Sequence, residues 1–155
     1  MSKALLLLTH LGCIAAGFAL GIYALPILMA PESPVVADAA TLERSAVYSG
    51  EFRRDLVDSD FLHWGDGQVY LSADAVTFSG ELAPGPDYRL YLSPSFVETE
   101  AAFESLKPQM VELGPVKTFK DFIVTIDEPV NLSDYNTVVV WCESFGQFIT
   151  AAQYR

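Results

Sequence analysis

Two residues of this chain, Cys142 and His63, are of types that could carry chemistry. Cys142 is one of two cysteines in the 155 residues, and the other, Cys13, lies inside a long apolar run. A thiolate can exchange with disulfides or bind a soft metal ion or haem iron, and an unpaired cysteine outside the cytoplasm is a candidate for such a role. The alternative interpretation is a buried cysteine that packs as a small apolar residue.

His63 stands in the segment His63-Trp64-Gly65-Asp66-Gly67, which we interpret as a turn that leads into a strand. The glycines allow close backbone approach to a ligand, although an ordinary turn has the same composition. If the fold brings His63 close to Cys142, an imidazolium there would favour the thiolate. The acidic residues around His63 lack the regular spacing of a calcium-binding loop, so a solvated acidic face is the preferred interpretation: Asp55, Asp58, Asp60 and Asp66.

The chain lacks the short motifs of the common enzyme classes. It contains no G-x-S-x-G, H-E-x-x-H, P-loop, C-x-x-C or C-x-x-C-H sequence. A single histidine and a single cysteine follow residue 30, which excludes a four-ligand Cys/His zinc site within one chain. The residues alone therefore leave it open whether the protein is an enzyme.

The first thirty residues predict a membrane anchor. Residues Ala4 to Ala30 are almost purely apolar, and as a helix they would reach roughly 40 Å, more than the ~30 Å hydrocarbon core of a bilayer. A cleaved signal peptide is the alternative, but its apolar region is only about 7–15 residues long. Lys3 precedes the run and Glu32 and Asp38 follow it, so the positive-inside rule predicts a single-pass protein with its C-terminal domain in the periplasm or outside the cell.

Within this apolar run, small residues recur at every fourth position. Gly17 and Gly21 form a small-xxx-small pattern that permits a homodimer through close helix contact, although glycine is common in membrane helices in general. His10 is the only ionisable residue inside the run, and we interpret it as interfacial or structural rather than as a haem ligand.

The charge balance excludes nucleic acid as a partner. The chain has 20 acidic and 9 basic residues, a formal net charge of −11, and all the acids lie after residue 30. Phosphate binding requires a basic surface. Membrane lipid, through residues 4–30, and another protein of the cell envelope are the partners that remain.

After a linker at residues 31–44, expected to be mostly extended, residues 45–155 predict an all-β domain. Short runs of β-type residues alternate with Gly, Pro, Asp and Ser, and about eight short strands indicate a β-sandwich or small barrel. Residues 98–106 contain a single β-branched side chain, Thr99, and predict a short helix. Residues 137–142 (TVVVWC) are apolar on both faces, as in a strand covered on both sides. The expected strands are Val47–Arg53, Gln68–Ser72, Ala75–Ser79, Tyr88–Ser93, Val111–Leu113, Phe122–Ile126, Thr137–Cys142 and Phe148–Ala152.

The order of several short motifs resembles the DM-thirteen domain family across about residues 45–154. The motifs are Gly50-Glu51-Phe52, His63 with Gly67 four residues on, Val76-Thr77-Phe78, Gly85-Pro86-Asp87 before Tyr88-Arg89-Leu90-Tyr91-Leu92, Leu113-Gly114, and Tyr135 before Val138-Val139-Val140-Trp141-Cys142, with Phe145 and Phe148 at the end. The resemblance implies an all-β domain outside the cytoplasm that transfers electrons. It also implies that Cys142 is the hallmark cysteine of the family, a redox thiol or a ligand to a prosthetic group such as haem, and that His63 falls on the family's histidine position.

We therefore expect a membrane-anchored domain that takes part in thiol- or haem-linked electron transfer, with Cys142 as the redox or ligating residue and His63 as the residue that tunes it or supplies a second ligand. The sequence does not identify the cofactor. The alternative is a non-enzymatic module of the cell envelope that binds a protein or a ligand. That alternative predicts an apolar or aromatic surface patch and a fully buried Cys142.

Overall fold

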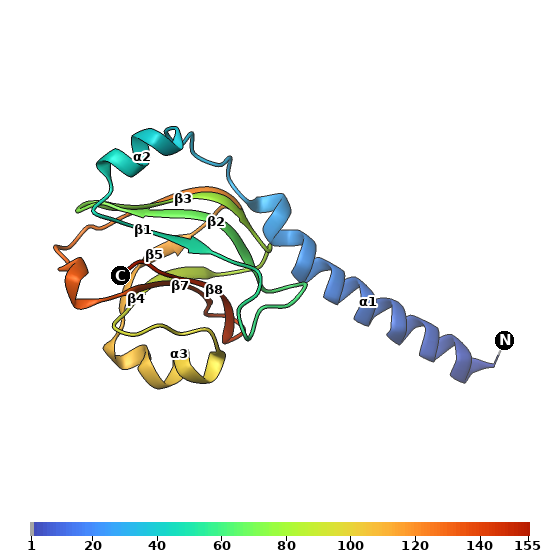
Figure 1. Cartoon of the computed structure of the whole chain (residues 1–155). Coiled ribbons are helices and arrows are strands. Elements are labelled where there is room, and N and C mark those ends of the chain that lie inside the picture. The colour runs from blue at the N-terminus through green and yellow to red at the C-terminus, as the bar shows by residue number, and fades with distance from the viewer. Residues whose placement is uncertain (1) are drawn as a thin grey trace.

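Two four-stranded antiparallel sheets face one another after a long N-terminal helix in the computed structural model, which describes residues 2–155 (Figure 1). The first sheet has the order β1-β2-β3-β6 and the second has the order β5-β4-β7-β8. Eight strands in two layers confirm the predicted β-sandwich. The first sheet consists of β1 (Tyr48–Phe52), β2 (Gly65–Leu71), β3 (Ala75–Leu82) and β6 (Lys120–Thr125). The second consists of β4 (Tyr88–Ser93), β5 (Val111–Val116), β7 (Thr137–Cys142) and β8 (Gln147–Gln153).

The main core lies between the two sheets and follows from alternation along the strands. Val69 and Leu71 of β2 face Leu90 and Leu92 of β4 across this core, and all four side chains are fully buried. Each such burial contributes about 1.5–3 kcal/mol, so the inward-facing side chains fix which face of each strand points inward.

Strand β7 is apolar on both faces because a second core covers the outer side of its sheet. Helix α3 (Glu100–Leu106), with η1 (Lys107–Gln109) directly after it, packs there. The rings of Phe103 and Trp141 stack with centroids 3.9 Å apart and planes 10° from parallel. The expectation that residues 137–142 form a strand covered on both sides is confirmed, as is the short helix before residue 107.

The segment after His63 is the start of a strand rather than a turn. Gly67 of β2 pairs with Gly80 of β3, with φ values of 145° and 159°. A Cβ on Gly67 would lie 2.4 Å from the carbonyl oxygen of Ser79. The glycines at this position therefore allow two backbones to approach closely within a sheet, and the composition of a turn concealed a strand pair.

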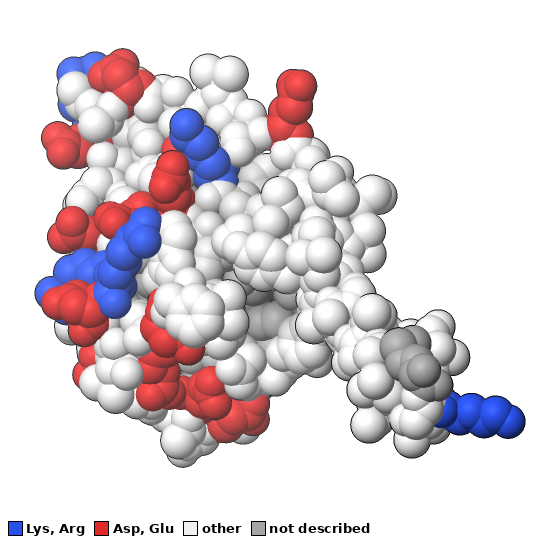
Figure 2. Space-filling model, turned by 90° about the vertical axis from the view of Figure 1, so that its right-hand side faces the viewer, with Lys and Arg blue, Asp and Glu red and all other residues white. Residues whose placement is uncertain are grey.

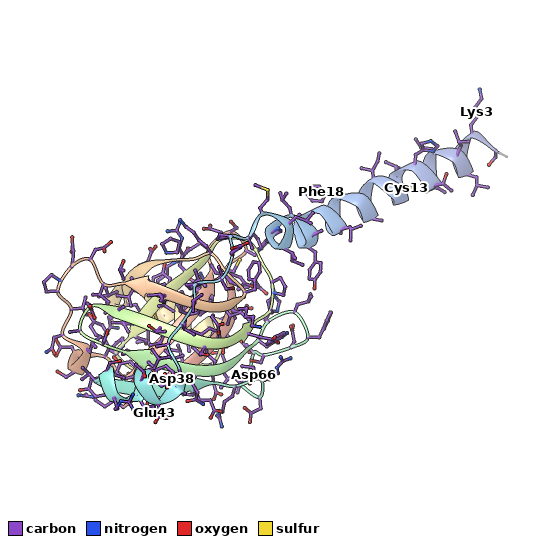
Figure 3. All side chains as sticks on the ribbon, turned by 90° about the horizontal axis from the view of Figure 1, so that it is seen from above. Lys3, Cys13, Phe18, Asp38, Glu43 and Asp66 are labelled. Carbon is purple, nitrogen blue, oxygen red and sulfur yellow. The ribbon has the colours of Figure 1, made fainter. Side chains whose placement is uncertain are left out.

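Helix α1 (Lys3–Met29) projects from one end of the sandwich and none of its residues is buried (Figures 1 and 3). It is long and apolar enough to cross a membrane, and a signal sequence would share these features. In Figure 3, Lys3 lies at the tip of the helix and Cys13 and Phe18 lie on its free part. The predicted homodimer through Gly17 and Gly21 remains a prediction.

The linker is only partly extended. Residues 31–38 contain no helix or strand, but Ala39–Ser45 form the short helix α2 inside the stretch expected as linker. Asp38 begins this helix by accepting a hydrogen bond of 3.1 Å from the backbone N–H of Thr41. The hydroxyl of Ser33 donates to the carbonyl oxygen of Lys120 in β6, so the linker lies against the sandwich. A second short helical turn, η2 (Leu132–Asp134), lies at the end of the sandwich away from α1 (Figure 1).

Candidate functional site

Cys142 ends strand β7 at the end of the sandwich from which α1 leaves. Its direct partner in the neighbouring strand is Tyr88, the first residue of β4. The turn before β4, residues 83–87, therefore lies beside the thiol. The same turn connects the two sheets, because it joins β3 to β4.

Three hydrogen bonds hold this turn against the hairpin that follows Cys142. The thiol donates to the carbonyl oxygen of Pro86 at 3.0 Å. The backbone N–H of Glu143 donates to the carbonyl oxygen of Asp87 at 3.1 Å, and the Ser144 hydroxyl donates to the Asp87 carboxylate at 3.0 Å. The position of the sulfur is thus fixed by contacts that are spread over both segments.

Gly85 allows the turn to fold over the ring of Tyr88. A Cβ on Gly85 would lie 2.4 Å from the Tyr88 hydroxyl oxygen. This buried hydroxyl donates to the carbonyl oxygen of Ala83 at 2.9 Å. The Gly85-Pro86-Asp87 motif therefore has a structural reason: glycine makes room for the ring, and Asp87 adopts a positive φ of 52°.

The Cys142 side chain is buried, with 2% of its surface exposed. Burial raises the pKa of the thiol above its ordinary value, and the negative charges of Asp87 and Glu143 add to this effect. Hydrogen bonds from the backbone N–H groups of Phe145 and Ser144 act in the opposite direction but do not reverse it. The thiol is therefore protonated at neutral pH, and its reactive form is scarce.

His63 is held by Asp60, three residues earlier in the same loop. The Asp60 carboxylate accepts hydrogen bonds from the backbone N–H groups of Leu62, at 2.7 Å, and His63, at 2.8 Å. It also lies 3.1 Å from Nδ1 of the imidazole. Burial raises the pKa of Asp60, but these hydrogen bonds and the imidazole outweigh it, so the pKa is lowered overall. A carboxylate at Nδ1 favours the tautomer with a proton there, which leaves Nε2 as the acceptor or ligand atom.

Sequence reasoning grouped Asp60 with the solvated acids and missed this positioning role. The signal was the spacing: an aspartate three residues before a histidine in a polar loop can cap its own turn and orient the ring. The other acids of the group do not share this arrangement. Asp66, for example, pairs with Arg54 at 2.8 Å on the surface, with both side chains at least half exposed.

Cys142 and His63 line one cleft, although 79 positions in the chain separate them. The cleft has a volume of about 500 Å³ and lies between the sandwich and α1. Its wall on the helix side consists of Ala19, Ile22 and Tyr23. The other lining residues are mostly apolar and come from the His63 loop, the turn before β4 and the β7–β8 hairpin: Leu62, Pro84, Gly85, Pro86, Tyr88, Phe145, Gln147 and Ile149.

The covered sulfur of this cleft does not suit direct iron ligation. Nε2 of His63 is free to bind a metal, and its side chain is 25% exposed. The sulfur, in contrast, is covered and hydrogen-bonded to a carbonyl oxygen. An iron ligand must be a deprotonated and accessible thiolate, and the raised pKa opposes this state. Cys142 therefore does not fit as a haem ligand in this conformation.

The fold and site thus define a two-sheet β-domain with one thiol and one imidazole at a mainly apolar cleft. A family model described as Electron transfer DM13 matches residues 55–154, and the chain belongs to this family. The match confirms the resemblance noted in the sequence. It covers β2 to β8, whereas β1, which pairs with β2 along its whole length, precedes the matched region. No curated protein and no solved structure matches the chain significantly.

Proposed function

We propose that the protein is a membrane-anchored electron-transfer domain of the cell envelope, with Cys142 as its redox residue and His63 as the residue that tunes it. One observation carries the proposal: the only cysteine and the only histidine that follow the apolar run line the same cleft. Membership of an electron-transfer family supports the same conclusion.

The chemistry is thiol–disulfide exchange with a small disulfide or with a disulfide of a partner protein. Cys142 loses its proton, and its sulfur forms a bond to one sulfur of the disulfide. The original S–S bond breaks, and the departing sulfur leaves as a thiolate that takes up a proton. His63 lines the same cleft, and its Nε2, left free by Asp60, is the imidazole nitrogen that would accept the proton that Cys142 loses.

The location follows from the anchor. We propose that α1 crosses the cytoplasmic membrane once, with Lys3 on the cytoplasmic side and the acidic sandwich outside. An oxidising compartment supplies the disulfides that the exchange requires. The predicted partner is accordingly another protein of the envelope.

The test is exchange with 4,4′-dithiodipyridine on the full-length protein in a Cys13→Ala background. We expect one pyridinethione to be released for each folded chain, with a rate that rises with pH because the thiolate reacts. Cys142→Ser should release none. His63→Gln should slow the release at neutral pH while unfolded protein reacts normally. Release only after unfolding would show that the sulfur is a packing residue and would refute the redox role.

One observation favours the alternative function, a non-enzymatic binding module. The side chain of Phe145, which lines the cleft, is 54% exposed, and that of Phe61, next to the lining residue Leu62 in the chain, is 85% exposed. Cys142 is buried, as that alternative predicts. A binding module would retain its partner when Cys142 is replaced by serine. An electron-transfer domain would keep the partner but lose the exchange.

A further inference from the structure

We propose that the rim of the cleft rests in the headgroup layer of the membrane that α1 crosses, so that the cleft opens into lipid rather than into water. The rim is defined as Leu62 and Phe145, which line the cleft, together with Phe61, which precedes Leu62 in the same loop. This inference depends on the part of the proposed function that makes α1 a membrane anchor. It does not depend on the redox role of Cys142.

Helix α1 is longer than a span of the hydrocarbon core requires. A helix crosses the hydrocarbon core with about 20 residues. Counted from Lys3, this length ends near Ile22, but α1 continues to Met29. Tyr23 thus lies at the membrane boundary, where the amphipathic ring of tyrosine is favoured.

Helix α1 forms part of the wall of the cleft. Ala19 lines the cleft together with Leu62 and Phe145. Ala19 precedes Ile22 by three residues, which places it about 4.5 Å inside the boundary of the hydrocarbon core. Side chains of the sandwich that share a cleft with Ala19 must therefore reach the boundary between headgroups and acyl chains.

The side chains of the rim are apolar and exposed. Phe61, Leu62 and Phe145 are large apolar side chains that stay exposed. They come from two loops, the one before β2 and the hairpin between β7 and β8. Exposed apolar side chains gathered beside a spanning helix are typical of contact with a membrane.

Charged side chains are unevenly distributed around the base of α1 (Figure 2). Figure 2 looks onto the end of the sandwich from which α1 leaves. Uncharged side chains cover most of the surface next to the helix, around a hollow, while most of the acidic and basic side chains lie on the side away from the helix, with some above and below the hollow. In a chain with 20 acidic residues, a surface beside the helix that is mainly uncharged favours contact with a lipid layer, and the carboxylates of the same loops, such as Asp60, would face water.

The lipid-facing mouth also defines the ligand class. Molecules that reach Cys142 through it are membrane-soluble or amphipathic disulfides and apolar partners, whereas water-soluble disulfides must cross the rim. The proposal therefore adds a route of access to the function proposed above.

Spin labelling of the full-length protein in phosphatidylcholine vesicles tests the inference. A nitroxide is attached at Phe61→Cys in a Cys13→Ala, Cys142→Ser background. Phe61 is 85% exposed, so the change leaves the core intact. The matched control is Glu128→Cys, an exposed position in the loop after β6 at the opposite end of the sandwich. Collisions with oxygen, which concentrates in lipid, are compared with collisions with a water-soluble nickel chelate.

We expect the ratio of oxygen to nickel collisions to be several-fold higher at position 61 than at position 128, with the same contrast at Phe145→Cys. Equal ratios in protein that stays in the bilayer on alkaline extraction would overturn the rim contact and leave the anchor intact. A label shielded from both reagents would indicate a protein partner on the rim and also overturn it. Release of the protein by alkaline extraction would refute the anchor itself.

Discussion

Gly85→Ala should disrupt the turn that positions Cys142. The added Cβ would lie 2.4 Å from the hydroxyl oxygen and 2.7 Å from Cζ of Tyr88, closer than real Cβ contacts come. The Tyr88 ring is buried and its hydroxyl donates to the carbonyl oxygen of Ala83, so the ring cannot move away without losing that hydrogen bond. If the turn moves instead, the bond from the Cys142 thiol to Pro86 is lost.

Either response has the cost of an overpacked site, about 1–3 kcal/mol. With an entropy of unfolding of ~2.1 cal/mol/K per residue over about 110 residues, a loss of about 2 kcal/mol lowers the melting temperature by roughly 9 °C. Calorimetry on the full-length protein in detergent measures this shift. In a Cys13→Ala background, maleimide labelling should also become faster, because the turn no longer covers the sulfur.

The matched control is Gly12→Ala, at which an added Cβ meets nothing within 4 Å and which lies outside the Gly17 and Gly21 pattern. It should leave both the melting temperature and the labelling rate unchanged. If Gly85→Ala melts with the control and labels at the wild-type rate, the close packing of the turn on Tyr88 does not hold the sulfur, and the reasoning about the motif is wrong.

Three further predictions concern charge, packing and pH. Asp87→Asn keeps the hydrogen-bond acceptor and tolerates the positive φ, but it removes a negative charge that, with burial, raises the pKa of Cys142. Alkylation of Cys142 at fixed pH should therefore become several-fold faster, and an unchanged rate would contradict this. Phe103→Ala removes the ring that stacks on Trp141 and should cost about 3–5 kcal/mol in a urea titration, without changing the pH profile of alkylation. The folded-state pKa of Tyr154 is raised to about 12, mainly by burial, and that of Cys142 is also raised. The contribution of these two groups to the free energy of unfolding is fully present below the unfolded-state pKa values, about 8.5 for a thiol and 10 for a phenol, and it is lost as pH rises through the folded-state values. A urea midpoint that does not change across this pH range would refute the assignment.

The strands that were predicted correctly are those whose pattern is set by burial. Residues 137–142 are apolar on both faces because two cores enclose them, and that pattern is visible in the sequence. The start of β2 was missed because Gly65 and Gly67 have the composition of a turn, while their role is to let backbones and side chains of other segments approach. Helix α2 was missed because its seven residues carry too little periodicity to distinguish a helix from a tether.

The candidate site was only partly predictable for a related reason. The residue types pointed to Cys142 and His63, and the local spacing could have indicated Asp60. The cleft, however, is built from α1, two loops and a hairpin that meet only in the folded chain. The burial of the sulfur, and with it the raised pKa, depends on this meeting and cannot be inferred from the neighbours of Cys142 in sequence.

The end of α1 has a mechanical consequence for the domain. Leu25, Pro26 and Met29 share a groove with Gly85 and Pro86, so the last turns of the helix lie beside the segment that covers the thiol. A bilayer thinner than the helix makes it tilt. Because Ser33 ties the linker to the sandwich, the domain is not free to swing independently of this tilt. If α1 spans a membrane as proposed, the orientation of the cleft relative to the bilayer therefore follows the tilt of the helix.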